Sequence, residues 1–302
     1  MVVRDGASRR TKPAAVGRDA RQLLGRTPPG YTLIRPLHDG VVTDLPAARL
    51  FIAAILRRAN RHFWSRIRPR AVIGVPLGAS PLEQRALLEA ADEAHIRKTV
   101  LIGEPIAGAL GCGIDPLDQR VHLVVDVGGG TAEVTAFCGG GIVDRRTCRV
   151  AGDEMTLATH HYLREEHQLL VGELVAEDVK IRASTEPGPS IIVEGRDAGT
   201  GRPRLVTVPV SDVSEAVKPV TEAIIATLSE CLDDLPPQGV GDVLAEGILL
   251  LGGGSLVPGF DQALEAAFGF SVKNADQPLT CVASGAARCL VDRPVLDAYG
   301  MT

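Results

Sequence analysis

The sequence lacks the cysteine patterns of zinc sites and of disulfide-stapled domains. Its six cysteines include no Cys-x-x-Cys pair, and no Cys/His spacing fits a zinc site. No secretory leader opens the chain, so a reducing cytosol is the expected compartment. No apolar run reaches the roughly 18 residues of a membrane-spanning helix. These absences argue against a secreted disulfide scaffold, a zinc module and an integral membrane protein.

Aromatic residues are few, and no strong positive charge is present. Only 10 of the 302 residues are Phe, Tyr or Trp, and 37 acidic residues outnumber 32 basic ones, for a net charge of −5. Base stacking needs aromatic platforms and phosphate backbones need positive surface, so we expect no nucleic acid as a partner. The 45% apolar and 23% charged residues are instead typical of a globular protein with one large domain or two ordinary ones.

Apolar residues recur at two different spacings along the chain, which predicts both strands and helices. Ser80, Pro81 and Glu83 mark the start of one helix through a capping box. Two β-rich runs around a triple glycine predict a hairpin over 122–137. Strands are expected over 72–76, 99–102, 188–210 and 247–251, and helices over 45–60, 80–95, 105–112, 153–183, 213–233 and 278–291, with another from about 259. This alternation predicts an α/β fold.

Two apolar strands each end in three glycines, at 128–130 and at 252–254. Successive free amides in such a run form a nest for anions, and glycine lets a ligand approach the backbone closely. Neither run belongs to a P-loop or completes Gly-x-Gly-x-x-Gly, so those two nucleotide sites are disfavoured. A tight hairpin is the simpler alternative for a single glycine run.

Acidic residues accompany the first glycine run. Asp126 precedes it by two residues and Thr131 follows it. A carboxylate beside a phosphate nest is placed to hold Mg²⁺ through water. Glu104, in Gly103-Glu104-Pro105 at a strand-to-helix junction, can orient an attacking water for phosphoryl transfer. The pattern therefore predicts a phosphate and metal site.

These segments resemble one known superfamily. Residues 124–131 resemble the second phosphate-binding loop of the actin and heat-shock-chaperone ATPases, and residues 251–257 resemble their adenosine-binding loop. More specifically, the chain resembles the MreB bacterial actins from about residue 1 to 291. The segments that carry this resemblance are 15–28, 34–42, 104–111 and 278–283.

The resemblance implies an actin-like ATPase fold, with two ribonuclease H-like domains around a nucleotide cleft. Domain I would comprise residues 1–122 plus 274–302, with 13–45 as a small subdomain, and domain II residues 123–273. Asp126 would hold Mg²⁺ and Glu104 would position the hydrolytic water. The implied ATP contacts are Gly128, Gly129, Gly130 and Thr131 at the phosphates, Glu177 at the ribose, Lys180 at the adenine, and Gly252, Gly253, Gly254 and Ser255 on the other side of the adenosine. Without the family, an ordinary surface ion pair is the favoured interpretation of Glu177 and Lys180.

A basic and aromatic segment covers residues 57–70, with six arginines, no acidic residue, and Phe63 beside Trp64. Aromatic tips ringed by cations suit the headgroup region of an anionic bilayer. The position also matches the loop by which family members contact the membrane. One alternative is a solvated basic helix end, with both aromatic side chains in the core. A nucleic-acid patch is another, which fits the overall negative charge less well.

The sequence departs from the family at its start. The first phosphate loop, of Asp-x-Gly-Thr type, is absent, and residues 2–5 resemble the family's third strand. Domain I is therefore expected to be N-terminally truncated, and this strand must find partners elsewhere. Either the natural start lies upstream, or the chain is a paralogue with weak or no ATP hydrolysis. Loss of one of the two phosphate-binding loops would remove on the order of several kcal/mol of transition-state stabilisation.

We therefore expect an MreB-like cytoskeletal protein that binds ATP and Mg²⁺. It would form homopolymeric filaments in the cytoplasm, peripheral at the inner face of an anionic membrane, and direct cell shape or wall synthesis with cell-wall synthesis proteins. One alternative is a filament partner or scaffold that binds nucleotide poorly and does not hydrolyse it. A chaperone-like or sugar-kinase relative is a further alternative, weakened because no substrate domain or sugar-binding insertion is evident.

Overall fold

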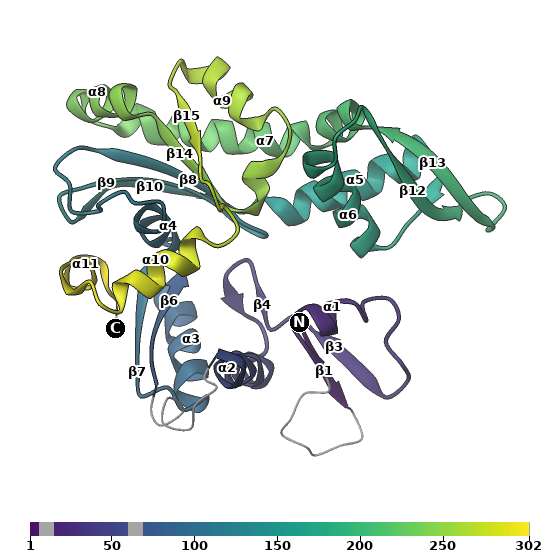
Figure 1. The fold of residues 1–302 in the computed structure, drawn as a ribbon, viewed down its shortest axis with the longest axis horizontal. Coiled ribbons are helices and arrows are strands. Elements are labelled where there is room, and N and C mark those ends of the chain that lie inside the picture. The colour runs from purple at the N-terminus through teal and green to yellow at the C-terminus, as the bar shows by residue number, and fades with distance from the viewer. Residues whose placement is uncertain (6–14, 60–68, 302) are drawn as a thin grey trace. The chain divides into compact units, whose positions relative to one another are not determined.

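The computed structural model describes residues 1–5, 15–59 and 69–301 (Figure 1). The chain divides into two units. Unit 1 contains Met1–Val75, Ala79–Ile102 and Gly300–Thr302, and unit 2 contains Pro76–Gly78 and Gly103–Tyr299. The domain limits expected at 122/123 and 273/274 remain a prediction. Phe63 and Trp64, expected at the membrane, lie outside the described residues.

The first strand of unit 1 has partners on both sides. Strand β1 (Val2–Asp5) is the centre of an antiparallel sheet, between β2 (Ala15–Val16) and β3 (Tyr31–Ile34). Val2 lies opposite both Val16 and Ile34. The family resemblance did not indicate which strands pair with β1. In the structure β1 pairs with two strands that are near it in the sequence, β2 and β3. A short helix, α1 (Arg18–Arg21), follows β2.

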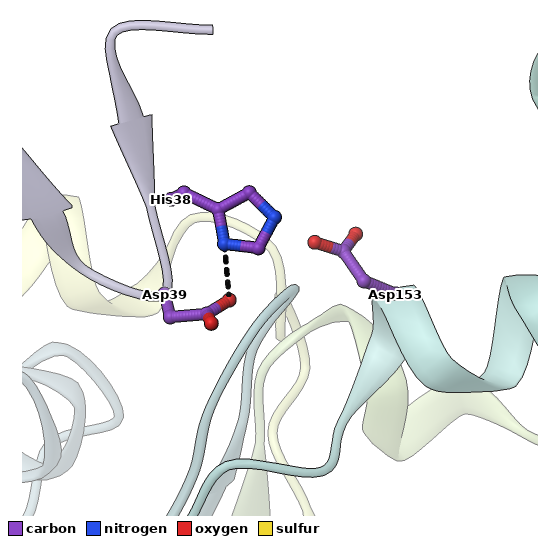
Figure 2. Close-up of side chains that lie close together, drawn as sticks. All are labelled: His38, Asp39 and Asp153. Atoms are coloured by element: carbon purple, nitrogen blue, oxygen red, sulfur yellow. Dashed lines mark ion pairs between the residues drawn. The ribbon is translucent and has the colours of Figure 1, made fainter. Parts of the chain in front are cut away.

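A two-residue hairpin follows in unit 1. Strands β4 (Leu37–His38) and β5 (Val41–Val42) are joined by Asp39 and Gly40, whose φ angles are +51° and +76°. Two positive φ angles are what a type I′ turn requires, and Asp-Gly is favoured there. His38 Nδ1 lies 3.0 Å from the Asp39 carboxylate. Figure 2 marks this pair with a dashed line. Asp153, labelled in the same view, belongs to the first turn of a helix of unit 2.

The remainder of unit 1 pairs two helices with a two-stranded sheet. Helix α2 (Leu45–Ala59) packs against α3 (Pro81–Glu93), and β6 (Arg70–Val75) pairs with β7 (Lys98–Gly103). The predicted capping box is present, because Ser80 Oγ accepts from the Glu83 amide and the Glu83 carboxylate accepts from the Ser80 amide. Val75, Leu87 and Leu101 form the core.

Unit 2 is built on a five-stranded sheet in the order β10-β9-β8-β14-β15. The predicted hairpin is confirmed, since β8 and β9 are antiparallel, whereas β14 runs parallel to both β8 and β15. Figure 1 shows α7 and α8 on one side of this sheet and α4 with α10 on the other. The strands are β8 (His122–Val127), β9 (Ala132–Cys138), β10 (Gly141–Cys148), β14 (Ile248–Leu251) and β15 (Val272–Asn274). The helices are α4 (Glu104–Gly111), α7 (Val210–Asp234), α8 (Pro237–Glu246), the 3₁₀ helix η2 (Gly253–Leu256), α9 (Phe260–Phe268), α10 (Cys281–Cys289) and α11 (Arg293–Tyr299).

Side-chain alternation along β8 separates the core from the site. Leu123, Val125 and Val127 belong to the core cluster that includes Ile224 and Leu228 of α7. Because successive residues of a strand point to opposite faces, Asp126 points to the face covered by α4. The same strand therefore contributes to the core on one side and to a polar site on the other.

The helix predicted over 153–183 is wrong as a single element. It is two helices, α5 (Gly152–Glu165) and α6 (Glu173–Thr185), separated by the short strand β11 (Leu169–Leu170). The break occurs where Gln168 adopts a φ of +51°, and Gly172 then caps α6. Strand β11 joins β12 (Ser190–Asp197) and β13 (Pro203–Pro209) in a second sheet, which confirms the β structure predicted over 188–210. No helix in the described ranges is long and apolar enough to cross a bilayer.

Candidate functional site

The two glycine runs leave neighbouring parallel strands at the same end. Leu251 of β14 is in register with Asp126 of β8, so both loops begin side by side at the carboxyl edge of the sheet. Open α/β sheets bind ligands at this edge. Gly252 has a φ of +85°, and a Cβ there would lie 2.2 Å from Val127 O and 2.6 Å from Asp126 Oδ1. Both the conformation and the space at this position require glycine.

The first glycine loop is held from behind by α5. The amides of Gly152 and Asp153 donate to the carbonyls of Gly128 and Gly129 at 3.2 and 2.6 Å, and the Gly128 amide donates to Thr131 O at 2.9 Å. Within the described part of the chain, no acceptor is hydrogen-bonded to the amides of Gly129 or Gly130. These two successive amides are therefore available to donate to an anion, and the nest that the glycine run predicts stays a prediction.

Three carboxyl groups gather beside this loop. Asp126 and Glu133 are direct cross-strand neighbours on β8 and β9 and are 7% and 2% exposed, while Glu104 begins α4. Burial, reinforced by the charges of Asp126 and Glu133, raises the pKa of Glu104 to about 8. Burial and then Glu133 raise the pKa of Asp126 to about 7, and burial also raises the pKa of Glu133. A divalent cation would relieve this repulsion.

Glu133 is the site residue that sequence reasoning missed. Its carboxylate accepts from the backbone amides of Leu77 and Gly78, both at 3.0 Å, and from Thr147 Oγ1 at 3.2 Å. Arg145 Nη1 donates to Leu77 O at 2.8 Å. The signal was available, because Glu133 is the lone acidic residue in β9, which contains no basic residue. Its partners are far away in the sequence and could not be read from it.

Lys180 lies behind the phosphate loop, on α6. Its Nζ donates to Gly152 O at 2.6 Å and to Thr156 Oγ1 at 2.8 Å, so it contacts the turn of α5 that holds Gly128 and Gly129. Glu177, one turn earlier on α6, is half-buried. On the second loop, Ser255 Oγ donates to Gly252 O at 2.7 Å and the Gly252 amide donates to Pro278 O at 3.2 Å.

Unit 2 thus holds together most of the residues predicted for the site. Asp126 and both glycine loops meet at one sheet edge, Glu104 is coupled to Asp126, and Lys180 is joined to the loop through α5. The roles assigned to these residues remain predictions.

Glu104→Gln is expected to stabilise the nucleotide-free protein against unfolding at pH 8, and to stabilise it much less at pH 5. The folded protein retains a proton on Glu104 up to about pH 8, whereas the unfolded chain releases it near 4.5. The free energy of unfolding therefore falls as pH rises between those values, by on the order of a few kcal/mol. Glutamine removes this dependence. Thermal unfolding from pH 5 to 9 measures it, with Glu173→Gln on exposed α6 surface as the control. Equal pH slopes in wild type and Glu104→Gln would contradict the assignment.

The fold that carries this site is actin-like. The chain superposes on MreB5 of Spiroplasma citri bound to AMPPNP with a TM-score of 0.88 and 26% identity, over 98% of this chain and 90% of that one. It superposes on a MamK double helical filament with a TM-score of 0.74 and 25% identity, over 92% and 89% of the two chains. These likenesses confirm the predicted α/β actin-like fold.

Sequence comparison narrows the class to one family. The family model described as MreB/Mbl protein matches residues 3–297. The cell shape-determining protein MreB of Escherichia coli K12 is 35% identical over 95% of this chain and 83% of its own length, and Mbl of Bacillus subtilis 168 is 34% identical over 91% and 83%. The chain belongs to the MreB/Mbl family of bacterial actin homologues, as the motifs predicted. Membership sets aside the chaperone-like and sugar-kinase alternatives.

Proposed function

We propose that this chain is a cytoskeletal subunit that binds ATP with Mg²⁺ and polymerises into filaments that direct cell shape or wall synthesis. The observation that carries the proposal is the contact of the two glycine loops beside Asp126. Relatives support the ligand and the assembly: MreB5 of Spiroplasma citri is known bound to AMPPNP and to ADP, and MamK as a double helical filament. Cell-wall synthesis proteins are the expected partners.

At the site, the free amides of Gly129 and Gly130, with Thr131, would bind the phosphates. Asp126 fits a hydrated Mg²⁺, because burial beside Glu133 makes its negative charge costly until a cation compensates it. When bound, the metal would neutralise phosphate charge. Glu104 would orient the attacking water. The second loop, Gly252, Gly253, Gly254 and Ser255, would face the adenosine together with Glu177 and Lys180.

Asp126→Asn is expected to weaken Mg·ATP binding by roughly 100-fold, because the variant loses the charge that faces the metal. Titration calorimetry with Mg·ATP measures the affinity, and electron microscopy of the same samples scores filaments. Asp233→Asn, on exposed surface of α7, is the matched control and should bind like wild type. Equal affinity of Asp126→Asn and wild type would refute the role of Asp126. A wild type that polymerises without binding Mg·ATP would favour the alternative, a nucleotide-independent scaffold.

We also propose that the segment 57–70 contacts the anionic inner face of the membrane, which would make the protein peripheral and cytoplasmic. Arg57 and Arg58 in the last turn of α2 are exposed, as is Arg70 where β6 begins. Cations at both ends of the segment suit acidic headgroups. Co-sedimentation with phosphatidylglycerol vesicles should therefore pellet the wild type, while the double variant Phe63→Ala/Trp64→Ala stays in solution. Undiminished pelleting of the double variant would exclude these aromatics as the anchor.

A further inference from the structure

Two cysteines from different helices meet in unit 2. Cys112 caps the carboxyl end of α4 and Cys281 is the first residue of α10. Both line one cavity, and each thiol lies close enough to the other to shift its pKa. The two backbones touch here: a Cβ on Gly111 would lie 2.0 Å from Cys281 O and 3.2 Å from Cys281 Cα. Tight packing of α4 on α10 therefore keeps Cys112, the residue after Gly111, beside Cys281. All six cysteines lie in the described residues, and none of them forms a disulfide there.

Small solutes can reach this pair. Both cysteines line a cavity of about 610 Å³, which His122, Lys273 and Arg288 also border. Cys112 is exposed, whereas Cys281 is only 3% exposed and donates its S–H to Pro278 O at 3.4 Å. One thiol is thus open to a reagent, and the second is in position to react with whatever forms on the first.

We propose that Cys112 and Cys281 form a modification site, at which a small peroxide closes an intrachain disulfide between α4 and α10. The Cys112 sulfur, as its thiolate, attacks one peroxide oxygen; the O–O bond breaks, and one water leaves after protonation. The Cys281 sulfur then attacks the sulfenic acid on Cys112, so that the S–O bond breaks, the S–S bond forms and the second water leaves. Two thiols and hydrogen peroxide yield one disulfide and two waters; the sulfurs are oxidised and the peroxide oxygens are reduced.

The surroundings make this a slow site. Cys112 is exposed on one side only, and desolvation of its packed side raises its pKa to about 11, with Cys281 and Asp276 adding to the rise and Arg288 opposing it. Burial raises the pKa of Cys281 as well. Thiolate is therefore scarce at neutral pH. The pair should stay reduced during brief exposure to peroxide and oxidise only when the exposure is prolonged.

The location gives the disulfide a structural consequence. Helix α4 begins at Glu104, and Pro278, three residues before Cys281, holds the amide of Gly252. The bond would fasten these two segments to each other. Because it also constrains the unfolded chain, the oxidised protein should melt at a higher temperature than the reduced one.

To test this proposal, the full chain is treated with hydrogen peroxide, alkylated and then digested. We expect two free thiols to disappear per chain, a peptide pair joined through Cys112 and Cys281 by mass spectrometry, and reversal by dithiothreitol. Cys112→Ser and Cys281→Ser should each abolish the cross-linked pair while keeping the wild-type circular dichroism spectrum. Cys148→Ser, which removes a half-buried thiol outside the cavity, should leave it intact. A wild type that keeps all its thiols, or that joins other cysteines instead, would overturn the proposal.

Discussion

Gly285→Ala, in α10, is expected to destabilise the protein by about 3 kcal/mol or more. A Cβ at this position would lie 1.7 Å from Ala107 O, 2.6 Å from Ala107 C and 2.8 Å from the Gly111 amide nitrogen. All three are backbone atoms of α4, so no side-chain rotation can relieve the overlap. The helices must separate instead, which opens the packing on which both depend.

Gly241→Ala is the matched control for this variant. Gly241 also lies in a helix, α8, but a Cβ there would meet no atom within 4 Å. Alanine should be neutral or stabilise by about 0.5–1 kcal/mol, since it narrows the unfolded ensemble and favours the helix. Urea unfolding of both variants at neutral pH gives the comparison. If the two midpoints coincide, the close approach of α4 and α10 is wrong.

Glu133→Ala is expected to cost about 3 kcal/mol of unfolding free energy. The change leaves the amides of Leu77 and Gly78 and the hydroxyl of Thr147 without their acceptor. The turn that they hold is tightly packed, because a Cβ on Gly103 would lie 2.5 Å from Leu77 Cδ2. Loss of the carboxylate should therefore loosen this turn as well as weaken the unit.

A second effect of Glu133 acts in the opposite direction. Its charge raises the pKa values of both Glu104 and Asp126, so removing it relieves repulsion. Glu133→Gln relieves the same repulsion but keeps one acceptor oxygen, and it should be less damaging than Glu133→Ala. Glu194→Ala, on an exposed position of β12, should be nearly neutral. If chemical unfolding gives Glu133→Ala and Glu194→Ala the same free energy of unfolding, the three hydrogen bonds contribute little to stability.

Local chemistry made several elements predictable. The capping box at Ser80 and Glu83 needs only residues three apart, and the hairpin around 128–130 needs only neighbouring β-rich runs. The contact of the two glycine loops is different, because β14 and β8 are distant in sequence and pair in parallel. Residue patterns flag each loop separately, and only the family resemblance indicated that they meet.

Other features left no readable signal. Gln168 breaks the predicted helix by adopting a positive φ. A glycine in the sequence would have indicated such a conformation, but a glutamine does not. The partners of Glu133 and the meeting of Cys112 with Cys281 depend on tertiary contacts between distant segments. For such contacts the residue types were visible, but their neighbours were not.

Amide hydrogen exchange with and without Mg·ATP tests the central proposal most directly. We predict slower exchange on nucleotide addition in residues 126–131 and 252–255, because the ligand would bind the free amides of the first loop and cover the second. The hairpin of β12 and β13, away from the glycine loops, should exchange as before. Bound nucleotide without protection of either glycine loop would contradict the account.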